Sequence, residues 1–207
     1  MNVFDRGLIL ASSSPYRKQQ LAKLGHQFTS QSPNIDESRQ HDETPSRLVE
    51  RLSYEKALAV QKPCPESIII GSDQVAYIKA EQNDNSLSTI EVLTKPNSIN
   101  NAIYQLSACS GKSVRFVTGL CVLSPQHAPQ IISEYVDVTF RQLSKREIEN
   151  YINIERPLDC AGSFRVEGLG ITLFDKVESS DPNTLIGLPL IALNKILISI
   201  GYNSLLT

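Results

Sequence analysis

Asp73 is the first residue in this sequence whose position suggests chemistry. It follows three consecutive isoleucines, 68–70, which are typical of a strand buried on both faces. Ligands of α/β proteins bind beyond the carboxyl ends of such strands, where a carboxylate is partly removed from water. The ionised form of Asp73 would therefore need a metal ion or a cationic partner. The alternative is an aspartate that caps a loop or pairs with a buried arginine.

Asp36 and Glu37 are adjacent acids in the polar stretch 34–43. Acids in a loop are usually just solvated. Together with Asp73, however, they could form a site made only of oxygen ligands, which is the kind that Mg²⁺ prefers. Histidines and cysteines are scattered without metal-ligand spacing. The residues therefore favour Mg²⁺ or Mn²⁺ over zinc.

The serine run 12–14 stands between an expected strand, 8–11, and an expected helix. Hydroxyl groups and backbone N–H groups at a helix N-terminus bind anions, and Arg17 could add a bidentate contact to phosphate. The alternative is an ordinary helix cap beside a surface arginine. Tyr16 could stack on a base at this place, or it could belong to the core.

Two lysines and one glutamate complete the candidates. Lys56 follows Leu48 and Leu52 at helical spacing, which places it near the inward face of a helix, although its ammonium could still reach water. Lys95 lies in a short "TKP" segment. Glu167 lies beside glycines, where a flat ligand can approach the backbone closely.

The composition excludes several classes of protein. The chain has 207 residues, 41% of them hydrophobic, and a formal net charge of −2 without a long basic run, which argues against a non-specific nucleic-acid binder. There is no apolar stretch long enough for a signal segment or a membrane span. We therefore expect a soluble, cytoplasmic protein whose four cysteines are reduced thiols. The phosphate-binding GxxxxGK[ST] and GxGxxG motifs are both missing.

Strands and helices are expected to alternate along the chain, which indicates an α/β or α+β fold. The expected strands are 8–11, 26–32, 68–78, 113–123 and 130–140, and the expected helices are 15–24, 45–61, 99–108, 145–153 and 187–200. Ser144 and Glu147 predict a capping box. Residues 162–174 suggest strands around a glycine turn, and 79–92 a polar connection with a hairpin tip. No shift in composition marks a boundary, so we expect one domain over residues 1–207.

A set of motifs in fixed order resembles the Maf-like nucleotide pyrophosphatase family over nearly the whole chain. The motifs are "LILASSSPYRKQQLAKLG", "NIDES", "RLSYEKA", "IIGSDQV", "LTKP", "LSACSGK", "VTGL", "YINIERPLDCAGSFRVEGLGITLF" and "NTLIGLPL". The forms "GSDQV" and "EGLGITLF" look like the YceF-like subfamily, which hydrolyses 7-methyl-GTP. A related branch that acts on dTTP and UTP carries "GADT" and "IQG" at the corresponding stretches.

The resemblance implies a two-lobed Maf/Ham1-like fold with a long twisted mixed sheet and a nucleotide cleft between the lobes. It implies that Asp73 is the catalytic carboxylate and that Glu37 and Asp73 hold a divalent metal. The residues that match its phosphate-binding positions are Ser12, Arg17, Lys56 and Lys95, and those that match its base-selecting positions are Tyr16, Gln74 and Glu167. The subfamily usually has Trp where this chain has Tyr16, so the stacking area is smaller.

The implied reaction is attack of water on the α-phosphorus, with pyrophosphate as leaving group and a divalent cation, Mg²⁺ or Mn²⁺, as cofactor. Asp73 would orient or deprotonate the water, directly or as a metal ligand. A buried Glu167 would suit a guanine edge and leave a pyrimidine badly paired. The alternatives are a pyrophosphatase for dTTP, UTP or other modified nucleotides, and a non-catalytic nucleotide-binding regulator of cell division. The expected partner is a small nucleotide, without nucleic acid or membrane, and a homodimer is left open.

Overall fold

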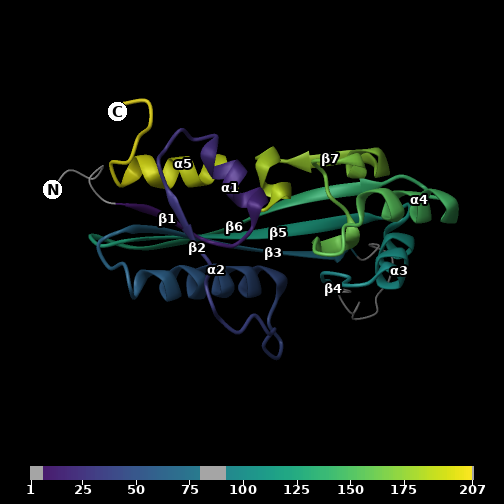
Figure 1. Ribbon diagram of the computed structural model, residues 1–207, viewed down its shortest axis with the longest axis horizontal. Coiled ribbons are helices and arrows are strands. Elements are labelled where there is room, and N and C mark those ends of the chain that lie inside the picture. Colours follow the sequence, from purple (N-terminus) through teal and green to yellow (C-terminus); the bar gives the residue numbers. More distant parts are fainter. Residues whose placement is uncertain (1–6, 80–91, 207) are drawn as a thin grey trace. The chain divides into compact units, whose positions relative to one another are not determined.

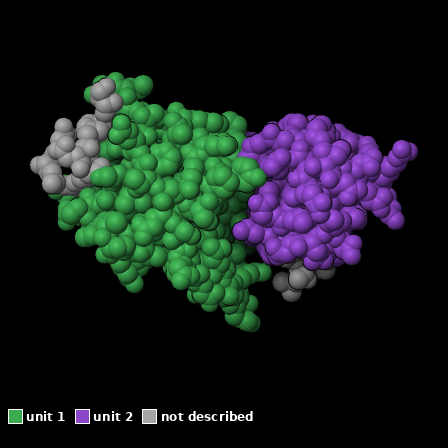
Figure 2. Space-filling model, in the orientation of Figure 1, with its two compact units in different colours: residues 1–74, 117–134, 181–207 green, residues 75–116, 135–180 purple. Residues whose placement is uncertain are grey.

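The computed structural model describes residues 7–79 and 92–206. It divides into two compact units, which Figure 2 colours separately: residues 1–74, 117–134 and 181–207 form unit 1, and residues 75–116 and 135–180 form unit 2. The expected hairpin tip within 79–92 lies outside the described residues, apart from the end residues 79 and 92. None of the helices in the described ranges is both long and apolar enough to cross a membrane.

The chain forms a mixed α/β fold, as expected. The strands are β1 (Leu8–Ala11), β2 (Thr29–Gln31), β3 (Ile68–Ile78), β4 (Val92–Leu93), β5 (Ser113–Ser124), β6 (His127–Phe140) and β7 (Phe174–Ser179). The helices are α1 (Pro15–Ala22), α2 (Pro45–Gln61), α3 (Ile99–Cys109), α4 (Lys145–Glu155) and α5 (Leu190–Ser199), with short 3₁₀ helices η2 (Ala161–Ser163), η3 (Leu169–Leu173) and η4 (Pro182–Ile186).

The strands pair in the order β2-β1-β3-β5-β6-β7, with β4 paired to β3. The strand β1 is parallel to both β2 and β3, whereas β4 is antiparallel to β3 and β7 is antiparallel to β6. Parallel neighbours require crossover connections, and the helices α1 and α2 supply them. The result is a mixed sheet, which agrees with the expected fold class.

In unit 1, β1 and the first half of β3 are buried on both faces. Alternate residues of β1 and β3 point to opposite sides, as the pleat requires. Leu10 and Ile70 belong to a core that includes residues of α1 and α5, whereas Ile9 and Ile69 belong to a core that includes residues of α2. Figure 1 shows α1 and α5 on one side of these strands and α2 on the other. Two covered faces explain the run of three isoleucines.

In unit 2, three phenylalanines, Phe116, Phe140 and Phe174, pack edge to face around Phe164, with ring centroids 4.9–5.7 Å apart. The expected capping box at the start of α4 is present, since Ser144 and Glu147 bind each other's backbone N–H groups. The expectation of strands over 162–174 is wrong: this segment contains η2 and η3, and the strand β7 begins only at Phe174. Its glycines permit tight turns that compete with strand pairing.

Several element boundaries also differ from the expectation, and two of them matter most. The strand expected at 26–32 is shorter, since β2 covers only Thr29–Gln31. The last helix begins at Leu190 instead of residue 187, because η4 and a left-handed Gly187 precede it. A proline at position 189 then provides the start of α5. These differences leave the order of elements unchanged.

Candidate active site

Lys56 and Asp73 form a buried ion pair in unit 1. The Nζ atom of Lys56 lies 2.5 Å from Oδ1 of Asp73, and the two residues are only 6% and 8% exposed. The expected inward position of Lys56 on its helix is therefore confirmed. Asp73 does not end its strand, however, because β3 continues to Ile78. The site thus lies along the middle of a strand rather than beyond its carboxyl end.

A close approach between α2 and β3 brings these two side chains together. A Cβ atom at Gly71 would lie only 2.0 Å from the backbone oxygen of Ser53 and 3.0 Å from the Cβ atom of Ala57. Only glycine leaves room for the helix backbone at this point. Because α2 rests directly on the strand at Gly71, Lys56 can reach Asp73.

Glu37 is the second carboxylate at this ammonium. Its Oε1 atom lies 2.9 Å from Nζ of Lys56, and its side chain is 56% exposed. The two acids that the sequence suggests as an oxygen-ligand pair therefore meet at a single positive charge. Asp36, the adjacent acid, accepts a hydrogen bond from the backbone N–H of Ser38 instead.

The loop that carries Glu37 is held by an ion pair that the sequence did not single out. Arg51 lies on α2 and donates to both carboxylate oxygens of the buried Glu43, at 2.7 and 2.9 Å, and to the backbone oxygen of Ser38, at 3.0 Å. The hydrogen bond from Arg51 lowers the pKa of Glu43 despite its burial. The loop and the helix that carry Glu37 and Lys56 are thus fastened to each other.

The serine run forms the helix cap that its sequence predicts. Ser14 accepts a hydrogen bond from the backbone N–H of Arg17, and Pro15 occupies the first turn of α1. The hydroxyl oxygen of Ser12 accepts from the backbone N–H of Ser14, at 3.1 Å, which leaves the hydroxyl proton of Ser12 available. This helix N-terminus alone would be an ordinary cap, but Arg17 links it to the carboxylates.

Arg17 is anchored through its Nε atom, which donates to the backbone oxygen of Gly187 at 2.8 Å. Gly187 has φ +102°, and a Cβ atom there would lie 3.3 Å from Nε of Arg17. Burial lowers the pKa of Arg17, and the negative charges of Asp73 and Glu37 oppose that shift. The guanidinium therefore lies close enough to both acids for their charges to act on it. Among the described residues, no hydrogen bond occupies its terminal N–H groups.

Gln74 follows Asp73 on β3 and is bound through its side-chain nitrogen. The Nε2 atom donates to the hydroxyl of Thr118 and to the backbone oxygen of Thr184, both at 2.9 Å, and lies 3.3 Å from the backbone oxygen of Leu185. The amide is consequently fixed against η4. Only its oxygen remains for a ligand.

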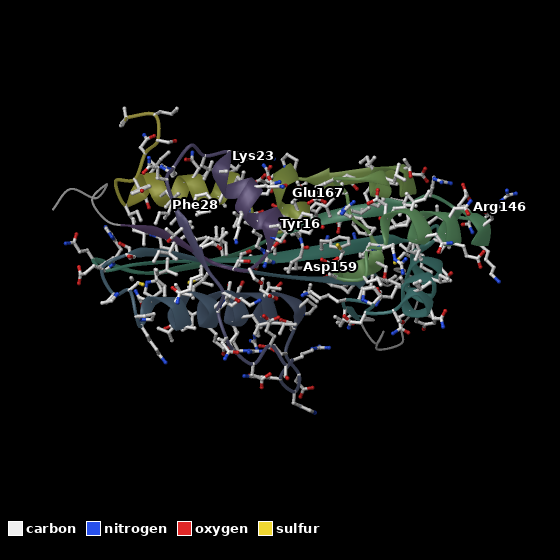
Figure 3. All side chains as sticks on the ribbon, in the orientation of Figure 1. Tyr16, Lys23, Phe28, Arg146, Asp159 and Glu167 are labelled. Carbon is white, nitrogen blue, oxygen red and sulfur yellow. The ribbon has the colours of Figure 1, made fainter. Side chains whose placement is uncertain are left out.

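Tyr16 and Glu167 are labelled in Figure 3. Tyr16 lies at the start of α1, where it is half-buried. Glu167 belongs to unit 2, between η2 and η3, and is exposed instead of buried as expected. Lys95 also belongs to unit 2 and is exposed. The structure therefore brings together Glu37, Lys56 and Asp73 in unit 1, with Arg17 near both acids. Ser12 lies in the same unit, whereas the parts expected for Lys95 and Glu167 rest on the resemblance alone.

The segment that carries Glu167 is held in unit 2 by α4. The carboxylate of Glu155 accepts from the guanidinium of Arg165, at 2.5 Å, and from the backbone N–H of Leu169, at 2.9 Å. The hydroxyl of Tyr151 accepts from the backbone N–H of Arg165. The segment on both sides of Glu167 is thus fixed although Glu167 itself is exposed.

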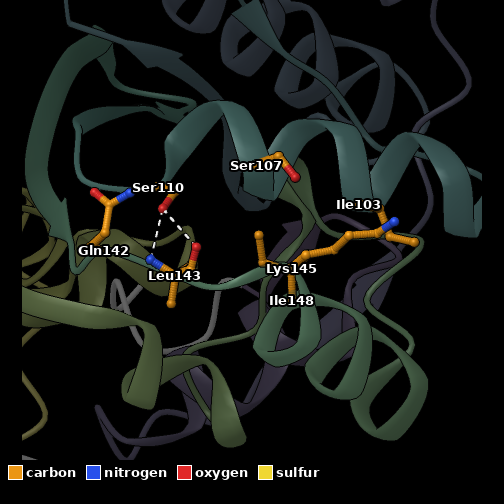
Figure 4. A pocket seen from close by; sticks show the side chains of 7 residues that line it. All are labelled: Ile103, Ser107, Ser110, Gln142, Leu143, Lys145 and Ile148. Carbon is orange, nitrogen blue, oxygen red and sulfur yellow. Dashed lines mark hydrogen bonds between the residues drawn. The ribbon is translucent and has the colours of Figure 1, made fainter.

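A separate hollow of about 330 Å³ lies in unit 2 between α3 and the start of α4 (Figure 4). Its lining residues are Ile103, Ser107, Ser110, Gln142, Leu143, Lys145 and Ile148. The hydroxyl of Ser110 joins its walls through the backbone of Leu143. None of the residues expected to do chemistry lines this hollow.

The donors in unit 1 fit a divalent cation that is shared with a phosphate ligand. The carboxylates of Glu37 and Asp73 both lie against the ammonium of Lys56, and Mg²⁺ is commonly held by one or two carboxylates plus phosphate oxygens and water. In the described ranges, no group of three or more His, Cys, Asp or Glu side chains could hold a metal ion. Further ligands would therefore come from the substrate and from water.

Three comparisons place these features among known proteins. Residues 7–200 match the family model described as "Maf-like protein". A "7-methyl-GTP pyrophosphatase" from Alcanivorax borkumensis is 52% identical over 94% of this chain and 94% of the relative. One of the same name from Colwellia psychrerythraea is 50% identical over 90% of this chain and 88% of the relative.

Among solved structures, the Ham1 protein of Staphylococcus aureus has a similar fold. It matches with a TM-score of 0.52 and 12% identity, over 94% of this chain and all of that one. At this identity the likeness concerns the fold alone, and it agrees with the expected Maf/Ham1-like class. The family match over residues 7–200 and the relatives at 50–52% identity decide the classification. The chain belongs to the family of Maf-like proteins.

Proposed function

We propose that this protein is a nucleoside triphosphate pyrophosphatase that hydrolyses 7-methyl-GTP to 7-methyl-GMP and diphosphate. The observation that carries the proposal is the convergence of two acids on Lys56, with the charge of Arg17 acting on the same acids. Relatives that are 50–52% identical bear the name of this activity. The cations would bind the negatively charged triphosphate, and a carboxylate would accept the proton of the attacking water.

The phosphate groups would meet a positive and hydrogen-bonding surface. Arg17 would direct its terminal N–H groups at phosphate oxygens while Nε stays on Gly187. Lys56 would add a second charge, and the hydroxyl of Ser12 a neutral donor. These groups stabilise the negative charge that builds up on the leaving diphosphate.

Asp73 would orient the attacking water and accept its proton. The water oxygen forms a bond to the α-phosphorus, while the bond from that phosphorus to the bridging oxygen breaks. The bridging oxygen leaves with the diphosphate. A divalent cation bound by Glu37 and Asp73 would neutralise charge on the triphosphate. The resemblance implies one of two roles for Asp73: it would act as the base itself or as a ligand of the cation.

Base recognition is proposed for Tyr16, Gln74 and Glu167. A 7-methylguanine ring carries a positive charge, and stacking on Tyr16 would contribute about 0.5–2 kcal/mol. Glu167 would accept hydrogen bonds from the N1–H and the 2-amino group. Since Glu167 is exposed and lies in unit 2, its part depends on the family resemblance. Lys95, in the same unit, is proposed as a further phosphate contact on the same ground.

The test is the release of pyrophosphate from 7-methyl-GTP, GTP, dTTP and UTP by the purified protein. We expect 7-methyl-GTP to have the highest kcat/KM and the Glu167→Gln variant to reduce that preference without loss of fold. Faster hydrolysis of dTTP or UTP would overturn the substrate and leave the reaction standing. Binding without any pyrophosphate release would favour a non-catalytic regulator.

We also propose a cytoplasmic protein that works as one functional domain over residues 1–207. Its proposed partner is a small nucleotide, with no nucleic acid and no membrane surface, and the charge of −2 supports this proposal. Light scattering of the purified chain would distinguish a monomer from a homodimer. A shift of labelled DNA or RNA at physiological salt would contradict the proposed partner class.

A further inference from the structure

The side chain of Gln74 is held in a single orientation by its neighbours. Its two N–H groups face three oxygen atoms, which belong to the hydroxyl of Thr118 and to the backbone of Thr184 and Leu185. Thr118 is fully buried and donates its own hydroxyl proton to the backbone oxygen of Thr184, at 3.0 Å. Only lone pairs of Thr118 therefore face Gln74. A flipped amide would place its oxygen against three acceptors, which cannot pair with it.

The turn that supplies these acceptors is itself fixed to the strands. Ser72, which is fully buried on β3, has its hydroxyl 2.8 Å from the backbone oxygen of Gly119 and 2.9 Å from that of Gly187. The oxygen of Gly187 also accepts from Arg17. Arg17, which is proposed to bind phosphate, and the amide of Gln74 thus both donate hydrogen bonds to one short segment, 184–187.

We propose that Thr118 is a positioning residue that makes Gln74 a reader of hydrogen-bond donors on the base. Because Nε2 is taken up by the protein, only Oε1 can meet the ligand, and it can only accept. Among the described residues, Oε1 of Gln74 has no hydrogen-bond donor of its own. The inference rests on the proposed function, and it adds Thr118, on β5, to the residues that select the base.

The chemistry of the bases makes this orientation selective. Guanine and 7-methylguanine present donors at position 1 and at the 2-amino group, whereas adenine presents an acceptor at N1 and only C2–H beside it. A fixed acceptor favours the guanine edge. Without the Thr118 hydroxyl, only two backbone oxygens hold the amide, so it would turn more often, offer its N–H groups to adenine and lose part of this discrimination.

The experiment compares Thr118→Val, which removes the hydroxyl at nearly constant volume, with Thr118→Ser, which keeps it. We expect Thr118→Val to lower the ratio of kcat/KM for GTP over ATP about five- to tenfold. Thr118→Ser should stay within about twofold of the wild type. The ratio for 7-methyl-GTP over GTP should not move in either variant, because both nucleotides carry the same donors at positions 1 and 2.

A double-mutant cycle separates positioning from a general structural effect. In a Gln74→Met background, Thr118→Val should produce no further change in the ratio for GTP over ATP. A folded Thr118→Val variant with the wild-type ratio would overturn the proposal. So would the same change in ratio with and without Gln74.

A second readout does not depend on catalysis. The side-chain NH₂ resonances of Gln74, assigned by their loss in Gln74→Met, should exchange slowly with water in the wild type and in Thr118→Ser, and faster in Thr118→Val. Equal exchange in all three proteins would overturn the fixed orientation. If the wild type releases no pyrophosphate at all, the proposed function fails, and this NMR comparison still decides whether Thr118 holds the amide.

Discussion

Lys56 donates to Asp73 across 2.5 Å, and the same ammonium also lies 2.9 Å from Glu37. Removing one partner from a buried ion pair usually costs about 3–5 kcal/mol, because the other charge is left alone. Here the ammonium would keep Glu37 as a partner when Asp73 is neutralised. The arrangement therefore allows the chemistry of Asp73 to be tested without collapse of the fold.

We predict that Asp73→Asn folds and loses at least roughly two orders of magnitude in kcat, the usual effect of removing a general base. Turnover of 7-methyl-GTP and circular dichroism would be measured on the same sample. Asp137→Asn is a matched control, because Asp137 is a carboxylate bound by Arg115 and Lys79 in unit 2. It should cost stability while kcat is retained. Near-normal turnover of a folded Asp73→Asn would remove Asp73 from the mechanism.

The second prediction concerns the cation. Activity should disappear after dialysis against excess EDTA and return with Mg²⁺ or Mn²⁺, since the donors are carboxylate oxygens. Glu37→Gln should raise the Mg²⁺ concentration needed for half-maximal activity about tenfold or more. Asp36→Asn removes the same charge one residue earlier and should leave that concentration unchanged. Full activity after exhaustive EDTA treatment would contradict the cation requirement.

Arg17 should contribute equally to every nucleotide, because phosphates carry no information about the base. We expect Arg17→Gln to lower kcat/KM about ten- to a hundredfold for all substrates. Arg17→Lys should rescue little of this loss, because lysine cannot keep the Nε contact with Gly187. The neighbouring exposed Lys18 provides the control Lys18→Gln. A variant at Arg17 that altered only base preference would show that its role is misassigned.

Two fully buried threonines should differ in how much stability they lose with their hydroxyl groups. Thr118 both donates and accepts, so Thr118→Val should lower the free energy of unfolding by about 1–3 kcal/mol. In the part of the chain that the structure describes, the hydroxyl oxygen of Thr184 is buried without a hydrogen-bond partner. Thr184→Val should therefore be neutral or stabilising. Urea denaturation measures both, and an equal loss in the two variants would mean that a bound water satisfies Thr184.

Stability should fall as the pH is lowered below about 6.5, the ordinary pKa of histidine. Burial lowers the pKa of His26, whose ring lies 4.6 Å from that of Tyr202. The unfolded chain then binds more protons than the folded one between the lowered pKa and the ordinary one, so protonation favours unfolding. Urea midpoints at pH 7.5 and 5.5 should differ less in His26→Phe than in the wild type. His41→Asn, at an exposed position, is the control, and an unchanged pH dependence in His26→Phe would refute the assignment.

Much of the fold could be predicted from local patterns. Ser14 with Pro15 and Ser144 with Glu147 mark helix starts through their own hydrogen bonds, and both caps form. The isoleucine run predicts a strand covered on both faces, and β3 is such a strand. The family was also predictable, because its motifs recur in order along nearly the whole chain. These signals act over a few residues, so the sequence alone carries them.

The segment 162–174 could not be predicted in this way. Its apolar residues resemble a strand, but contacts from α4 hold it as two 3₁₀ helices: Glu155 binds Arg165 and the backbone of Leu169. The partners come from a helix that ends before this segment begins. Long-range side-chain contacts therefore outweighed the local preference for a strand.

In the site, the sequence by itself determined which residues are available: acids at positions 37 and 73, cations at 17 and 56, and an amide at 74. Only the tertiary structure decided what each one meets. Gly71 lets α2 lie on β3, so that Lys56 reaches Asp73. Thr118, more than forty residues from Gln74, fixes the amide of that side chain. The physical reason is that hydrogen bonds and ion pairs depend on distances of about 3 Å between groups far apart in the chain, and close packing of helix on strand sets those distances.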